Sequence, residues 1–76
     1  MTDPIERTPD VCGGSARIAG TRVPVWVIEG YHELGAGRIE LSAAFDLSIA
    51  QVDAALKYAH EHPEEIAAEI ASNEDP

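Results

Sequence analysis

The positions of the residues that interrupt helices constrain this sequence more than any other feature. Pro24 fits only the first turn of a helix, Gly35 can stop one, and Pro63 can only end a helix or begin the next. Further prolines and a glycine pair fall within the first fifteen residues, where little hydrophobic pattern surrounds them. We therefore expect an irregular arm over residues 1–15, with a short extended piece near Ile5, and only short elements after it.

Hydrophobic spacing assigns the elements that follow the arm. Two β-compatible runs flank Gly20, which can take the positive φ of a tight turn, so residues 16–23 predict a small hairpin. Such a hairpin is marginal by itself in water and has to pack on helices or on a second subunit. Helices are expected over about residues 24–34, 39–45 and 49–61, followed by an acidic helix from Pro63 and a disordered end over residues 72–76.

The helices carry start signals and inward faces. Ser48 followed by Gln51 is a capping box, the clearest helix start in the chain, and Asp53 with Lys57 predicts an i,i+4 ion pair on the same helix. We expect the buried faces to be formed by Val27, Ile28, Tyr31 and Leu34 of the first helix, Leu41, Ala44 and Phe45 of the second, and Ile49, Val52, Leu56 and Ala59 of the third.

The predicted architecture is mainly α: a short N-terminal β-hairpin, a helix-turn-helix domain and an acidic C-terminal helix. The hairpin and the helix-turn-helix form a domain over residues 16–62, and residues 63–76 form the terminal helix and tail. A chain of 76 residues buries only about 60% of its unfolded surface, so we expect it to gain stability from a partner or a second copy. One cysteine excludes an internal disulfide, and neither a signal-peptide pattern nor a membrane-spanning run is present, so we expect a cytoplasmic protein.

Charge is distributed unevenly along the chain. The net charge is −9, which is unfavourable for binding nucleic acid, because such binding depends on neutralising phosphates. Residues 1–38 hold four arginines against five acidic residues, whereas residues 39–76 hold one lysine against nine acidic residues. An acidic partner could therefore meet the first half, and a basic partner the second half.

The helix-turn-helix over residues 39–60 is the first candidate for a function. A short helix, a tight turn and a capped longer helix is the arrangement that places a second helix in a DNA major groove. The alternative is an ordinary packing unit, because the longer helix carries only one positive charge. Arginines of the hairpin could contact DNA, or could keep an edge strand from aggregating. The residues expected at a DNA-binding or dimer surface are Arg17, Thr21, Arg22, Gln51 and Lys57.

The acidic end of the chain is the second candidate. It is either a solvated helix face with a loose tail, or an amphipathic segment that folds onto a basic surface of a partner. Trp26 is a further candidate because tryptophan is enriched at binding hot spots, although it could also be a core residue. The residues expected to bind a partner are Trp26, Tyr31, Glu61, Glu64, Glu65, Ile66, Glu69 and Ile70, and we expect residues 61–76 to be removable without loss of the fold.

No combination of residues predicts catalysis, a cofactor or a metal. His60 and His62 are two residues apart, so their rings do not share a helix face, and Cys12 has no second cysteine to complete a zinc pattern. A small hydrolase or nuclease would need clustered carboxylates or a Cys–His pair, and the sequence offers neither at suitable spacing. We therefore expect no enzymatic activity.

Two segments resemble a known family. The run GSARIAGTRVPV at residues 14–25 is similar to the signature G-x-P-x-I-x-G-T-R-[IV]-P-V of the "domain of unknown function 433" proteins, which are grouped with VapB-like antitoxins. LSIAQVDAALKYA at residues 47–59 resembles the family's ending L-[ST]-x-x-x-V-x-A-A-L-x-Y-A. Ala16 replaces the usual proline, and the segment before Ser48 is shorter than the common version. The resemblance covers about residues 5–62.

This resemblance implies a homeodomain-like helix-turn-helix fold, a homodimer and a partner. The implied partner is a PIN-like ribonuclease toxin, whose carboxylate cluster holds Mg²⁺ or Mn²⁺, and an antitoxin inhibits it by blocking access. Antitoxins of this kind often also bind their own operator DNA. We therefore expect the antitoxin of a type II toxin–antitoxin pair, with a stand-alone helix-turn-helix DNA-binding regulator as the alternative.

Overall fold

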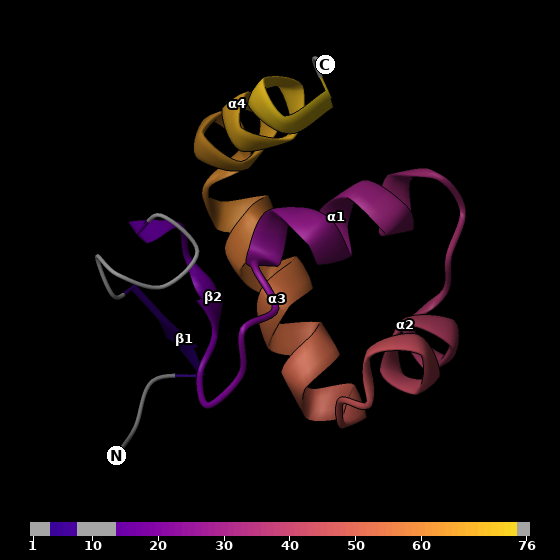
Figure 1. The fold of residues 1–76 in the computed structure, drawn as a ribbon. Coiled ribbons are helices and arrows are strands. Elements are labelled where there is room, and N and C mark those ends of the chain that lie inside the picture. Colours follow the sequence, from indigo (N-terminus) through magenta and orange to yellow (C-terminus); the bar gives the residue numbers. More distant parts are fainter. Residues whose placement is uncertain (1–3, 8–13, 75–76) are drawn as a thin grey trace.

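The computed structural model describes residues 4–7 and 14–74, and shows a small sheet beside a set of packed helices (Figure 1). The longest helix, α3, runs through the middle, with α2 near its beginning and α4 at its end. No helix in this part of the chain is both long and apolar enough to cross a membrane. The mainly helical fold predicted from the sequence is confirmed, and its elements are β1 (Ile5–Glu6), β2 (Arg17–Ile18), α1 (Val25–Glu33), α2 (Arg38–Phe45), α3 (Ile49–Glu61) and α4 (Pro63–Glu74).

The sheet consists of two antiparallel strands with a pairing that differs from the predicted one. Ile5 lies opposite Ile18, and Glu6 lies opposite Arg17. The extended piece expected near Ile5 is therefore a strand, β1. It pairs with β2 in the place where the sequence predicted residues 21–23. This pairing joins the N-terminal segment to the rest of the fold.

The tight turn after β2 is confirmed, although its second limb is not a strand. Gly20 has a φ of 79°, and the Ile18 N–H donates to the Val23 carbonyl at 2.9 Å. The Thr21 hydroxyl donates to the Ile18 carbonyl at 2.8 Å and accepts from the Val23 N–H at 3.1 Å. The Thr21 hydroxyl bonds hold the backbone in a turn, and Pro24 has no N–H to donate. Residues 21–24 therefore form only an isolated bridge with β2, between Pro24 and Arg17.

α3 supplies the centre of the core. Its buried residues are Val52, Ala55 and Ala59, and the two alanines allow neighbouring helices to approach closely. Around them pack the buried side chains Ala16, Ile18, Val25, Ile28, Leu41, Leu47 and Ile66. Of the other residues expected inward, Phe45, Ile49 and Leu56 are half-buried, whereas Ala44 is exposed.

α1 buries a different face from the predicted one. Val25 and Ile28 are fully buried, whereas Tyr31 is 51% exposed and Leu34 is 83% exposed. The Val25 N–H donates at 2.9 Å to the carbonyl of the residue before β2, and this bond fixes the start of the helix against the sheet. The helix is thereby rotated so that Val25, rather than Val27, faces the core.

α4 is longer and more deeply packed than predicted. Pro63 is its first residue, so this proline begins a helix rather than ending one. The helix continues through Ser72 to Glu74, which shows that the disorder expected there is wrong; the last two residues of the chain lie outside the described ranges. Ile66 is 1% exposed and belongs to the core. Deletion of residues 61–76 would remove this core side chain, so we now expect it to destabilise the fold rather than to leave it intact.

The start of α3 agrees with the sequence analysis, but its ion pair does not. The Ser48 N–H donates to the Gln51 side chain at 2.8 Å, and the Gln51 N–H donates to the Ser48 hydroxyl at 3.1 Å, which confirms the capping box. Asp53 accepts two hydrogen bonds from Arg38, at 2.6 and 2.7 Å, instead of pairing with Lys57. The bidentate arginine contact connects α2 to α3, whereas a pair between Asp53 and Lys57 would have stayed within α3.

Candidate protein-binding groove

The outer surface of α1 is unusually apolar. Tyr31 and Leu34 project from it, whereas Ile39 in the first turn of α2, which is 78% exposed, lies outside the groove lining described below. Trp26 in α1 and Ile70 in α4 are only half-buried. Single exposed apolar residues are ordinary, but a contiguous group of them marks a surface that binds another molecule.

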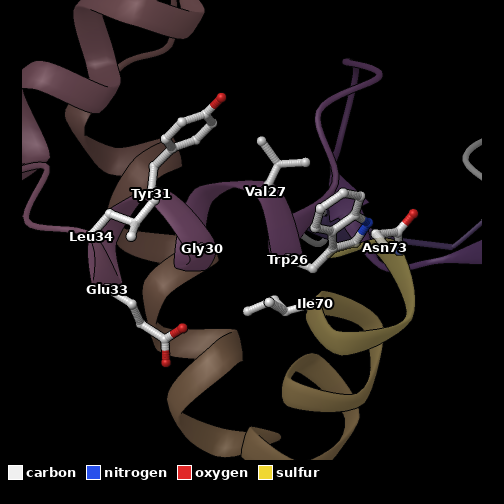
Figure 2. Close-up of a pocket in the computed structure, with 8 residues that line it drawn as sticks. All are labelled: Trp26, Val27, Gly30, Tyr31, Glu33, Leu34, Ile70 and Asn73. Carbon is white, nitrogen blue, oxygen red and sulfur yellow. The ribbon is translucent and has the colours of Figure 1, made fainter. Parts of the chain in front are cut away.

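The outer side of α1 and the adjoining side of α4 form a groove with a volume of about 360 Å³. Figure 2 shows Ile70 pointing from α4 toward α1, between Trp26 and Glu33, with Asn73 beside the indole ring. Most of the lining is apolar or aromatic. The complete lining is Trp26, Val27, Gly30, Tyr31, Glu33, Leu34, Ile70 and Asn73.

Gly30 lies in the middle of this lining (Figure 2). A Cβ atom added to it would meet no other atom within 4 Å, and its φ is not positive, so neither crowding nor backbone geometry requires a glycine. Glycine inside a helix costs about 0.8–1.0 kcal/mol relative to alanine. The groove is therefore deepened at its centre by a residue that the fold does not need.

A second hollow, of about 310 Å³, adjoins the groove and shares Glu33 and Ile70 with it. Its ionisable lining residues are Glu29, Glu33 and His60, and the buried Ile66 contributes to its apolar wall. Burial raises the pKa of the Glu29 carboxyl, and the charge of Glu33 one turn away raises this pKa further. The half-buried Glu29 carboxylate and the exposed Glu33 carboxylate thus lie together directly beside the apolar groove.

The hairpin residues predicted for DNA binding are mostly engaged inside the fold. Arg17 is 7% exposed, and its guanidinium donates to the Glu6 carboxylate and, at 3.2 Å, to the Thr21 carbonyl. This guanidinium, together with the Gly20 N–H, lowers the pKa of Glu6. Arg17, Thr21 and Arg22 do line one hollow, of about 370 Å³, but only Arg22 among them is exposed. Arg17 is therefore a structural residue of the sheet.

The other two residues predicted for DNA binding lie on α3 and do not line that hollow. Gln51 is occupied by the capping box. Lys57 is exposed, but the exposed Asp53 and Glu61 lie on the same helix. The solvent side of α3 therefore carries no excess of positive charge for a phosphate backbone.

Glu65, predicted to bind a partner, belongs to an intramolecular clasp formed with Arg7 and Tyr58. The Arg7 guanidinium donates to the Tyr58 hydroxyl at 2.8 Å and to the Glu65 carboxylate, and the Tyr58 hydroxyl donates to the same carboxylate at 2.9 Å. Burial raises the pKa of Tyr58, and the His62 ring stacks on it with centroids 4.3 Å apart. Sequence reasoning missed Arg7 because 51 residues separate it from Tyr58.

The remaining predicted residues of the acidic segment are divided between core and surface. Ile66 is a core residue, 1% exposed, that contributes only to the wall of the second hollow. Glu69 is half-buried, and its Oε1 atom has no hydrogen-bond partner in the described part of the chain. Glu61 and Glu64 are exposed, and Ile70 lines the groove. The structure thus brings Ile70 together with the predicted residues Trp26 and Tyr31, but not with the acidic residues of its own helix.

Metal-ligating side chains are scattered over the described residues, which contain no group of three or more that could hold an ion. His60 and His62 are both exposed near the end of α3. Cys12, the third member of the combination considered from the sequence, lies outside the described ranges.

Comparisons with known proteins agree with the resemblance carried by the two sequence motifs. The family model described as "Protein of unknown function (DUF433)" matches residues 5–59. The crystal structure of a DUF433 member protein from Anabaena variabilis ATCC 29413 is similar, with 45% sequence identity and a TM-score of 0.86, over 92% of this chain and 70% of that chain. No curated protein matches this sequence. The chain belongs to the DUF433 family.

Proposed function

We propose that the protein is a non-enzymatic binding protein, the antitoxin of a type II toxin–antitoxin pair, and that it binds a PIN-like ribonuclease toxin through the groove between α1 and α4. The observation that carries the proposal is the groove itself, in which Trp26, Tyr31 and Leu34 meet Ile70 at the surface. The choice of toxin as partner comes from the family resemblance of the two motifs.

The groove has the composition of a binding hot spot. Tryptophan and tyrosine dominate the energetics of protein interfaces because they bury large areas with few rotatable bonds. The Tyr31 ring packs against Phe45 with centroids 5.8 Å apart at an interplanar angle of 52°, which restricts the ring before a partner arrives. A side chain that is already restricted loses less conformational entropy on binding.

Inhibition of this kind requires no chemistry by the protein itself. A PIN-like toxin cleaves RNA at a carboxylate cluster that holds a divalent ion, so covering the cluster or its approach is sufficient. Shape and charge at an interface provide such a block. The proposal therefore gives no residue of this chain a catalytic role.

Binding to operator DNA, and a homodimer that would support it, are separate expectations that need a different surface. The net charge of −9 weakens attraction to phosphates, and Arg17 is withdrawn into the sheet. Among the residues predicted for DNA binding, the exposed cations Arg22 and Lys57 are the contacts that such a mode could use. The stand-alone DNA-binding regulator is thus the rival function, and it predicts duplex binding that depends on these two residues.

The test is co-expression of the tagged protein with a PIN-like ribonuclease from the same genome, followed by purification and an RNA-cleavage assay. We expect stoichiometric co-purification and loss of cleavage. Leu34→Ser and Trp26→Ala each remove an apolar contact of the groove, and we expect each to weaken toxin binding by at least about tenfold, as for a hot-spot residue.

Ile39→Ser is the matched control, because Ile39 is nearly as exposed as Leu34 but does not line the groove. This variant should bind the toxin like the wild type. Equal effects of Leu34→Ser and Ile39→Ser would exclude the groove as the toxin site. If no toxin is bound, and a duplex carrying the operator is retained until Arg22 and Lys57 are replaced, the regulator is the correct function.

A further inference from the structure

The apolar groove and the acidic hollow are parts of one surface. Glu33 and Ile70 line both, so any segment that lies on the groove between α1 and α4 comes within reach of the acidic hollow. Figure 2 shows the Glu33 side chain on the side of α1 that faces Ile70, away from the Tyr31 ring. A partner segment would therefore meet aromatic surface at one end and carboxylates at the other.

The acidic hollow is electrostatically unsatisfied in the free protein. Glu29 and Glu33 are one turn apart on α1, where like charges repel. Burial and the Glu33 charge both raise the pKa of Glu29, whereas His32 and His60 only partly oppose this rise. A cation placed between the two carboxylates would remove the repulsion and supply hydrogen-bond donors in partly desolvated space.

Charge also argues against a second copy of this chain as the occupant. Each copy carries a net charge of −9, and a two-fold symmetric contact through this groove would place both acidic hollows in the same interface. Like charges that face each other across an interface disfavour association. A basic partner is favoured instead, because its positive charge is complementary to the negative charge of the hollow.

We infer that the groove recognises a partner segment in which an arginine or lysine stands beside apolar side chains, with the apolar residues on Trp26 and Leu34 and the basic group between Glu29 and Glu33. This inference rests on the proposed function, since it names the chemistry of the partner segment that the groove accepts. The acidic pair then selects the partner, and the apolar lining supplies most of the contact area.

The test uses a displayed library of random peptides of about a dozen residues. The library is selected on the wild-type protein and counter-selected on Leu34→Ser, which retains the acidic pair but disrupts the groove. We expect the enriched peptides to share one basic position next to apolar residues. An enriched peptide and its arginine-to-glutamine version are then titrated by fluorescence anisotropy, and we expect the glutamine version to bind about tenfold more weakly.

The double variant Glu29→Gln/Glu33→Gln should bind both peptides within about twofold of each other, because it has lost the discriminating charges. Glu64→Gln is the matched control, since Glu64 is an exposed acid that lines neither hollow, and it should keep the tenfold ratio. Enriched peptides without a basic residue, no enrichment over the counter-selection, or a tenfold ratio that persists in the double variant would each overturn the inference.

Analytical ultracentrifugation of the free protein tests whether a second copy of the chain occupies the groove. A dimer that dissociates in Leu34→Ser would show that a second copy fills the groove, which would also overturn the inference. The peptide ratio does not depend on the toxin assay. Failure of toxin binding with an intact peptide ratio therefore rejects only the antitoxin assignment, and the reverse outcome rejects only the basic-segment inference.

Discussion

Single residues of α1 break local rules of stability, and they do so together at the groove. Gly30 costs helix stability without a structural need, Glu29 and Glu33 repel one another, and Leu34 exposes a large apolar side chain. At the capping box of α3, by contrast, local preference and structure agree. Departures that gather in one place are the expected mark of a binding site, because a binding surface is selected for its complex rather than for the free fold.

Gly30→Ala should separate stability from binding. The added methyl group meets open space, so we expect the free energy of unfolding to rise by about 0.5–1 kcal/mol, as for glycine replaced inside a helix. The same methyl group enters the groove and should weaken partner binding. Urea unfolding followed by circular dichroism measures the first effect, and anisotropy with the selected peptide measures the second. Equal or tighter peptide binding would show that the groove centre is not contacted.

Glu29→Gln should stabilise the protein at neutral pH but not in acid. The folded-state pKa of Glu29 is raised above its ordinary value of 4.5, so the native state binds this proton more tightly than the unfolded chain does. Stability from this group is therefore present below about pH 4.5 and is lost as the pH rises through the folded pKa. Relief of the i,i+4 repulsion alone is worth about 0.2–0.5 kcal/mol.

Urea unfolding of Glu29→Gln and wild type at pH 7 and pH 3 measures this effect. We expect the variant to be more stable at pH 7 and the difference to shrink at pH 3. Glu64→Gln is the control with the opposite sign, because Glu64 lies in the first turn of α4, where a negative charge favours the helix dipole. A stability gain for Glu29→Gln that is the same at both pH values would contradict the assignment to its ionisation.

At the scale of elements, sequence signals within a few residues correctly predicted the features that depend on short-range contacts. The bounds of α1, α2 and α3 to within one residue, the turn at Gly20 and the capping box of α3 depend on neighbours within a few residues, and these are confirmed. The pairing of β1 with β2 and the rotation of α1 depend on contacts between distant segments. The sequence holds two apolar stripes on α1, one through Val25 and Ile28 and one through Val27 and Tyr31, and tertiary contacts, including the backbone bond at Val25, bury the first.

The difference between local and long-range contacts also explains which residues of the candidate site could be predicted. Trp26, Tyr31 and Ile70 were expected at a partner surface and do line the groove, but Leu34, Gly30 and the acidic pair of α1 were not expected there. The acidic residues of α4 were favoured instead, because their density along the chain is obvious. The groove becomes visible only when α1 and α4 are placed side by side, which no spacing along the sequence reports.

At the scale of the whole molecule, α4 packs into the core with the other helices, so we expect it to unfold together with them. Its Ile66 packs in the core with residues of α1 and α3, and its Glu65 is tied to Arg7 through the clasp. A chain of 76 residues has few such contacts to spare, so losing one buried side chain removes a large share of its stability. Because Ile70 and Asn73 of α4 line the groove, the groove forms only when α4 is packed on α1, and partner binding therefore depends on the folded state.

Ile66→Ala should therefore lower the free energy of unfolding by about 2–5 kcal/mol, the range for truncating a buried isoleucine. Because α4 carries one wall of the groove, the variant should also bind the selected peptide less tightly than the wild type, although Ile66 itself does not line the apolar groove and contributes only to the wall of the acidic hollow. Ala68→Ser in the same helix is exposed, lines neither the groove nor the acidic hollow, and serves as the control for both readouts. Urea unfolding and anisotropy on the same samples check the two effects together. If Ile66→Ala unfolds at the wild-type urea concentration, α4 is an independent tail, and the view of groove and fold as a single cooperative unit is wrong.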